Sequence, residues 1–159
     1  MFTKEDYNKW LEDDTNPELN KKMVEEFPFL LPRNVWTGEV VAGYDYHYNE
    51  LWALLPGWQK AFGYELICEL RDALVAAKML HSYRISQIKE KYGSLRWYDF
   101  GATDEVYDII HKYEKISETV CANCGVDTNV DEYGYDWLCE DCAKKLKRRK
   151  VNWKSMELF

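Results

Sequence analysis

The segment that decides the fold is Arg84-Ile85-Ser86-Gln87-Ile88-Lys89-Glu90-Lys91-Tyr92-Gly93-Ser94-Leu95-Arg96-Trp97-Tyr98. Its two halves have the character of strands, and Tyr92-Gly93 stands between them where a tight turn favours glycine, so the segment predicts a β-hairpin. Apolar residues at helical spacing occupy residues 64–80 before it and residues 103–116 after it. Helices on both sides of a hairpin favour an α+β fold, in which helices pack on a small antiparallel sheet.

Residues 1–27 contain the start signals of two further helices. Thr3 is followed three positions later by Asp6, which is the spacing of a capping box at a helix N-terminus. Asn16-Pro17 has the form of an N-cap followed by the first helical residue. We expect the second helix to end before Pro28, because proline cannot continue it.

Four cysteines near the C-terminus form two pairs with the spacing of metal ligands, Cys121 with Cys124 and Cys139 with Cys142. Two residues within a pair let both thiolates reach one tetrahedral ion, and the 14 residues between the pairs contain Gly134 and can form a hairpin. Cysteine then fills all four positions, which predicts a structural zinc ion with no open position for catalysis. Two disulfides, a redox-active pair and an iron site are the alternatives.

The chain has 159 residues, of which 47% are hydrophobic and 31% charged, a composition typical of a globular protein. Its net charge of −7 argues against broad non-specific DNA binding, which needs clustered positive surface. Residues 1–120 hold 14 basic and 21 acidic residues, whereas residues 121–159 hold seven of each. We therefore expect an α+β main domain over residues 1–120, a zinc ribbon over residues 121–145 and a terminal segment over residues 146–159.

Two sequence features bear on cellular location. No apolar run approaches the roughly 18 residues of a membrane span. The N-terminus has no basic-then-apolar signal segment. We therefore expect a cytoplasmic protein with no membrane contact.

The hairpin segment also carries a recognisable motif. From Gln87 to Tyr98 it follows the pattern Q-[IV]-K-E-K-[FY]-G-x-L-R-[FW]-Y, which resembles that of an uncharacterised group of small proteins from bacteria and their phages. The resemblance includes Gly57-Trp58, Gly101-Ala102-Thr103-Asp104 and the cysteine pairs, and so spans roughly residues 57–145. It implies this order of elements, a C-terminal zinc ribbon and a setting in a bacterial or phage-infected cell, but no substrate.

The hairpin supplies four candidate ligand-binding residues, Lys89, Lys91, Arg96 and Tyr98. On one strand Lys89 and Lys91 point to a single face, and on the other Arg96 and Tyr98 do the same. If the register brings these faces together, three cations and an aromatic ring converge, which suits a phosphate or carboxylate with a ring beside it. The alternative is a solvated strand face with cross-strand ion pairs.

A second aromatic cluster lies between residues 44 and 58. The alternation of Tyr44, Tyr46 and Tyr48 predicts an extended piece with three rings on one face, and Trp52 and Trp58 follow. Rigid rings suit stacking on a ligand or contact with a protein. Tyr46 and Trp58 are our candidates for ligand contact here, and packing in the core or at its edge is the alternative.

Six of the seven residues from Lys144 to Lys150 are basic. We expect this run to continue a helix that begins at the second cysteine pair and to be a candidate contact for nucleic-acid phosphate or an acidic protein. The alternative is a solvated helix end that offsets the acidic residues beside it. The apolar residues that follow are expected to dock on the domain or on a second copy of the chain, giving a homo-oligomer: Val151, Trp153, Met156, Leu158 and Phe159.

No G-x-S-x-G, phosphate-binding glycine loop or H-E-x-x-H motif is present, so we expect a non-enzymatic protein. The leading hypothesis is a binding protein that captures a small anionic aromatic ligand, such as a signalling nucleotide, and so blocks a host pathway. The resemblance implies that such a protein is encoded by a phage. One alternative is a protein-interaction module that acts on a host or phage protein. The other is nucleic-acid binding through residues 144–150.

Overall fold

The computed structural model of the chain describes residues 1–134 and 136–151. Its first two helices are α1 (Lys4–Glu12) and α2 (Pro17–Glu26). Thr3 and Asp6 form the predicted capping box, and the Asn16 side chain accepts hydrogen bonds from the first turn of α2. Both start signals are therefore confirmed, because these side chains satisfy N–H groups that have no partner within the helix.

The segment between α2 and the next long helix contains the 3₁₀ turns η1 (Pro28–Leu30) and η2 (Glu50–Ala53) and, in its described part, no strand. The predicted extended piece at residues 44–48 is wrong, because Tyr46 adopts a φ of +63° and breaks the alternation. The tyrosine rings still gather: those of Tyr44 and Tyr46 are 4.9 Å apart, and those of Tyr44 and Tyr48 are 5.5 Å apart, between centroids. Local turns rather than strand periodicity bring them together.

A continuous helical run follows, made of α3 (Pro56–Trp58), the π-helical η3 (Gln59–Gly63) and α4 (Tyr64–Ala76). The helix predicted over residues 64–80 ends earlier than expected. Lys78 takes a φ of +58°, and the N–H of Met79 donates to the carbonyl of Leu74 at 2.8 Å, which is a Schellman ending without its usual glycine.

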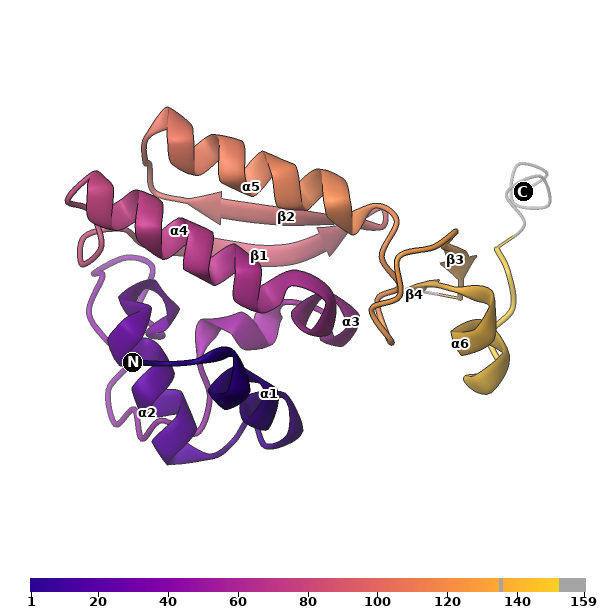
Figure 1. Ribbon diagram of the computed structural model, residues 1–159, viewed down its shortest axis with the longest axis horizontal. Coiled ribbons are helices and arrows are strands. Elements are labelled where there is room, and N and C mark those ends of the chain that lie inside the picture. Colours follow the sequence, from indigo (N-terminus) through magenta and orange to yellow (C-terminus); the bar gives the residue numbers. More distant parts are fainter. Residues whose placement is uncertain (135, 152–159) are drawn as a thin grey trace.

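The predicted hairpin is present, as the antiparallel pair β1 (Ile85–Lys91) and β2 (Ser94–Asp99). Tyr92 and Gly93 form its turn with φ values of +52° and +82°, as a two-residue type I′ turn requires. Helix α5 (Asp104–Ser117), capped by Thr103, packs against β2 and α4, as Figure 1 shows. Helices packed on an antiparallel hairpin confirm the α+β class.

Side chains of α5 also protect the outer edge of β2. The Ser117 hydroxyl accepts from the Leu95 N–H at 2.8 Å, and the Glu114 carboxylate accepts from the Trp97 N–H at 3.1 Å. The inward residues Ile88, Leu95 and Trp97 join the main core, which also takes side chains from α1, α2, α4 and α5. The hairpin is therefore held along one edge and on one face.

The C-terminal part, residues 121–151, is called here the cysteine-rich element. It contains β3 (Asp131–Tyr133), β4 (Asp136–Leu138) and α6 (Glu140–Lys145), and it lies at one end of the molecule (Figure 1). Its buried residues form a second core cluster, which begins at Cys121 where the main cluster ends at Val120. The N–H of Val151 donates to the carbonyl of Glu132, so the chain after α6 returns to β3.

Two expectations concern the end of the chain. The basic run does not continue the helix, because α6 ends at Lys145 and Lys147 adopts a φ of +54°. The apolar terminal residues 153–159 lie outside the described residues. Within residues 1–134 and 136–151, no helix combines the length and the apolar character needed to cross a membrane.

Candidate metal centre and hairpin face

The structure brings the four predicted metal ligands to one place. The Sγ atoms of Cys121, Cys124, Cys139 and Cys142 all lie within 4.8 Å of one another, and those of Cys124 and Cys139 are 3.8 Å apart. Four sulfurs at the corners of a tetrahedron, each about 2.3 Å from a zinc ion, would lie about 3.8 Å from one another. The site can therefore hold one metal ion with little rearrangement.

Local structure around each pair directs the sulfurs inward. Gly125 follows the first pair with a φ of +81°, which lets the chain turn back after Cys124. The second pair opens α6, where the Cys142 N–H points at the Cys139 sulfur at 3.5 Å. The side-chain amide of Asn123 donates to the Cys142 sulfur at 3.4 Å. Such N–H groups stabilise negative charge on thiolates.

The chemistry of the thiols also favours a cation. Burial raises the pKa of Cys139 to about 12 and raises that of Cys124. Burial opposes ionisation of Cys121 as well, but main-chain N–H groups bring its pKa down to about 7. With no cation, clustered thiolates would repel one another in a buried place, whereas a bound cation keeps coordinating thiols deprotonated.

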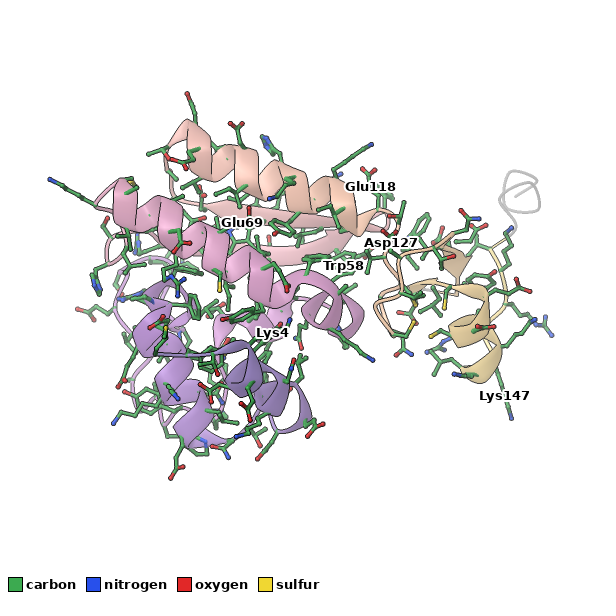
Figure 2. The ribbon with its side chains drawn as sticks, in the orientation of Figure 1. Lys4, Trp58, Glu69, Glu118, Asp127 and Lys147 are labelled. Atoms are coloured by element: carbon green, nitrogen blue, oxygen red, sulfur yellow. The ribbon has the colours of Figure 1, made fainter. Side chains whose placement is uncertain are left out.

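The first cysteine pair packs on the start of the helical run. The Gly57 N–H donates to the Ala122 carbonyl at 2.7 Å, and the Trp58 indole N–H donates to the Val120 carbonyl at 3.1 Å. A Cβ added at residue 57 would stand 2.0 Å from the carbonyl oxygen of Cys121, so only glycine fits. Figure 2 labels Trp58 close to this junction between the main domain and the cysteine-rich element.

Trp58 is therefore a structural residue. Its side chain is 1% exposed, so the prediction that its ring contacts a ligand is wrong. The ring packs near that of Phe62, and its one polar atom is occupied by the Val120 carbonyl. A buried tryptophan usually finds such a partner for its N–H.

A second contact joins the cysteine-rich element to the hairpin. The ring of Trp137, on β4, lies over Gly93, where an added Cβ would come within 2.6 Å of it. The turn of the hairpin therefore needs glycine both for its φ and for this close approach. Sequence reasoning missed Trp137, because nothing in its local pattern indicates a partner about 40 residues away.

The register of the hairpin brings together the four candidate residues on it. Lys89 pairs directly with Arg96, Lys91 pairs with Ser94, and Tyr98 pairs with Gln87. Ser94 is buried, so we call the outward surface formed by the other five residues, Gln87, Lys89, Lys91, Arg96 and Tyr98, the hairpin face. Lys89, Lys91 and Arg96 lie within 4.0 Å of no carboxylate oxygen in the described part of the chain, so the three cations on this face are not neutralised locally.

Cations also lie over the aromatic rings of this surface. The Lys89 ammonium is 5.9 Å from the ring centre of Tyr98, and the Lys91 ammonium is 5.8 Å from that of Tyr92. Just beyond the strands, the Arg84 guanidinium carbon lies 4.5 Å from the ring centre of Phe100. Sequence reasoning missed Arg84 and Phe100, although the two-residue period of β2 places Phe100 in line with Tyr98.

The structure does not place Tyr46 on the hairpin face. Tyr46 packs partly on the main core and lines a separate cavity of about 300 Å³ together with Val24, Pro28 and His81. Its prediction as a ligand contact therefore concerns a different place from the cations. Of the six predicted ligand-binding residues, four share one surface, one lies elsewhere and one is buried.

The basic run is partly neutralised. Lys144 pairs with Glu140 at 3.1 Å, Arg148 with Asp136 at 3.5 Å and Lys150 with Asp131 at 2.8 Å. Pairing of the run with nearby acidic residues is what the alternative interpretation of this run predicts. All these pairs are exposed, so they contribute little to stability, but they reduce the positive field available to a nucleic acid.

Comparison with known proteins gives no assignment. No protein-family model, no curated protein and no solved structure matches the chain. Function is therefore inferred from the geometry of these residues alone.

Proposed function

We propose that this is a non-enzymatic, zinc-stabilised binding protein whose hairpin face captures an anionic, ring-bearing ligand of the nucleotide class. The observation that carries the proposal is the convergence of Lys89, Lys91 and Arg96 on one open face without acidic partners among the described residues. Arginine offers a bidentate contact to phosphate, and Tyr98 offers a stacking surface beside it. In a phage-infected bacterial cytoplasm, such capture would withdraw a nucleotide from a host pathway.

The charge balance makes these cations informative. A chain with a net charge of −7 has acidic groups in excess, and ion pairs elsewhere in the molecule use nine of its other basic side chains, among them Lys4, Lys22 and Arg71. Three cations that stand together and unpaired repel one another. An anionic ligand would relieve this repulsion, which is the physical basis for binding.

Zinc is the metal we propose for the four cysteines, in a structural role. Four sulfurs close the coordination sphere and leave no position for water or substrate. Elemental analysis of protein purified without chelator should give one zinc per chain, and cobalt substitution should give the absorption of a tetrahedral tetrathiolate. An iron–thiolate absorption spectrum in the purified protein would show that the metal is iron and not zinc.

The ligand proposal is tested by calorimetry and thermal shift with a panel of nucleotides. We expect at least one nucleotide to raise the melting temperature of the wild-type protein and to lose affinity in Arg96→Ala and Lys91→Ala. Lys21→Ala, which removes an exposed lysine of α2, is the matched control and should bind as wild type. No shift with any nucleotide, or equal shifts in all variants, would reject the proposal.

A second candidate is contact with a protein, favoured by the loop before Val40. Trp36 is 89% exposed at the tip of a turn in which the Asn34 side chain accepts from the N–H groups of Trp36 and Thr37. An exposed tryptophan on an ordered turn is typical of an interface anchor. Sedimentation of the wild type and Trp36→Ala over a range of concentrations would detect contact with a second copy, as a dimer that the substitution weakens.

A further inference from the structure

Three exposed aromatic rings form a row on the hairpin face and at its two ends. Tyr98 lies near the end of β2, Phe100 follows directly after this strand, and Tyr92 lies at the turn end of the hairpin. These rings are 42%, 52% and 79% exposed, respectively, although large apolar rings are usually covered. Each has a cation against it, so the row combines stacking surfaces with positive charge along its whole length.

One end of this row is held firmly. The Arg84 guanidinium packs between the ring of Phe100 and the backbone of Gly38, where an added Cβ would come within 2.1 Å of Arg84 Nη1. The Phe100 N–H donates to the Arg84 carbonyl, which extends the hairpin pairing by one more step. Both side chains are therefore positioned before any ligand arrives, which lowers the entropic cost of binding.

We infer that this row binds single-stranded nucleic acid, laid along the strands with about four nucleotides in contact; the inference rests on the proposed function and names its ligand class. Side chains on one face of a strand repeat every two residues, or about 6.8 Å. The axial spacing of nucleotides in one strand of B-form DNA is only about 3.4 Å. A nucleic acid that matches the protein must therefore be extended and unstacked, as single strands are and duplexes are not.

The openness of the surface distinguishes an extended strand from a single nucleotide. Pockets for small ligands usually enclose most of the ligand surface. The cavities described along this chain, including those beside Lys60, His81 and Arg148, are lined by no residue between 84 and 100. Exposed rings with adjacent cations are instead the arrangement by which proteins hold single strands without sequence preference.

Acidic residues near the row are turned to other partners. Glu90 accepts from the Gly93 N–H at 2.7 Å, and Asp99 accepts from the Tyr83 hydroxyl at 2.7 Å. The hairpin face itself holds no carboxylate, only Gln87, Lys89, Lys91, Arg96 and Tyr98. The net negative charge of the protein thus limits long-range attraction of a nucleic acid. At the row itself, however, a phosphate chain would meet only positively charged side chains.

The test is fluorescence anisotropy with 5′-labelled oligothymidylates of two, four, eight and twelve nucleotides, with thymidine monophosphate as competitor. We expect affinity to rise steeply up to about four nucleotides. Beyond that length, affinity should rise only in proportion to the number of positions at which four consecutive nucleotides can occupy the row. Phe100→Ala and Tyr98→Leu should each weaken binding about fivefold or more, as loss of one stacked base implies. Lys21→Ala removes an exposed lysine outside the row and should bind as wild type. Melting temperatures confirm that every variant is folded.

Salt dependence gives an independent measurement. With four cations in contact, log K should fall with log salt at a slope of about −2.8, and Lys89→Ala should reduce that slope by about 0.7. The twelve-nucleotide oligothymidylate annealed to its oligodeoxyadenylate complement in the cold should bind more weakly than the single strand. A ribonucleotide series would show whether the strand is read by its backbone alone.

Three results would overturn the inference. If thymidine monophosphate binds as tightly as the octamer, the proposed function stands and the single-strand inference falls. If neither the monophosphate nor any oligonucleotide binds, both fall. If the oligonucleotides bind but only Lys145→Ala combined with Arg149→Ala weakens them, the basic run and not the hairpin face is the contact.

Discussion

Replacing Gly57 by alanine tests how the cysteine-rich element is attached to the main domain. Alanine inside a helix normally stabilises it by about 1 kcal/mol relative to glycine. Here the new Cβ would lie 2.0 Å from the Cys121 carbonyl oxygen and 2.6 Å from the carbonyl carbon of Ala122. Both obstacles are main-chain atoms, so the first cysteine pair must move as a unit to make room.

The cost follows from the contacts that this movement breaks. The hydrogen bond from Gly57 to Ala122 contributes about 0.5–1.5 kcal/mol, and leaving the buried Trp58 N–H without its Val120 partner costs about 1–3 kcal/mol. After the helix-propensity gain of about 1 kcal/mol is subtracted, Gly57→Ala should lower the free energy of unfolding by about 0.5–3.5 kcal/mol. For a chain of this length that lowers the melting temperature by roughly 1–14 °C.

Scanning calorimetry measures the loss of stability, and a colorimetric zinc indicator measures the rate of metal release, which should increase. Gly43→Ala is the control: Gly43 has a φ of +74° but no atom within 4 Å of an added Cβ. That variant should show a modest loss from backbone strain and an unchanged rate of metal release. A Gly57→Ala protein that melts at or above the wild-type temperature and releases metal at the wild-type rate would refute the close packing of the first cysteine pair on Gly57.

Three further outcomes are expected. Burial raises the pKa of Tyr44 to about 12, so this hydroxyl ionises at lower pH in the unfolded chain than in the folded one. The free energy of unfolding should therefore fall as pH rises from about 10 toward 12. Phenolate absorbance and circular dichroism should change together over this range. Trp58→Phe removes the donor to Val120 and part of a buried ring, and should cost at least about 1–3 kcal/mol in chemical denaturation. Chelation of the metal should abolish hydrogen-exchange protection in residues 121–151 while α4 and α5 stay protected, and an unchanged exchange pattern would contradict a structural metal.

Local chemistry accounts for what the sequence could predict. The Thr3–Asp6 capping box and the Asn16-Pro17 start each depend on residues within three positions, and the structure contains both. The hairpin was predictable because Gly93 lies between two segments of strand character. The cysteine spacing was sufficient because four like ligands have few ways to meet one ion.

What could not be predicted depends on contacts between distant residues or on unusual backbone angles. The end of α4 was missed because Lys78, rather than glycine, adopts the left-handed conformation there. The tyrosine alternation suggested a strand until Tyr46 proved to have a positive φ. Trp58 looked like a ligand contact, because its sequence neighbourhood cannot reveal a carbonyl 62 residues away that takes its N–H.

The metal centre and the hairpin face are connected through a short path. A metal ion held by the four cysteines would fix β4, because Cys139 follows this strand directly, and β4 carries the Trp137 ring that lies over Gly93. Gly93 is bonded to Tyr92, the ring at the turn end of the aromatic row. Because a two-stranded hairpin alone is marginally stable, this cover adds to the support that α5 gives the turn end through Ser94 and Leu95. Under the proposed function, a bound metal ion would therefore act at a distance from any ligand. Together with α5 it would hold the turn end of the hairpin in shape, while Arg84 packs on Phe100 at the other end.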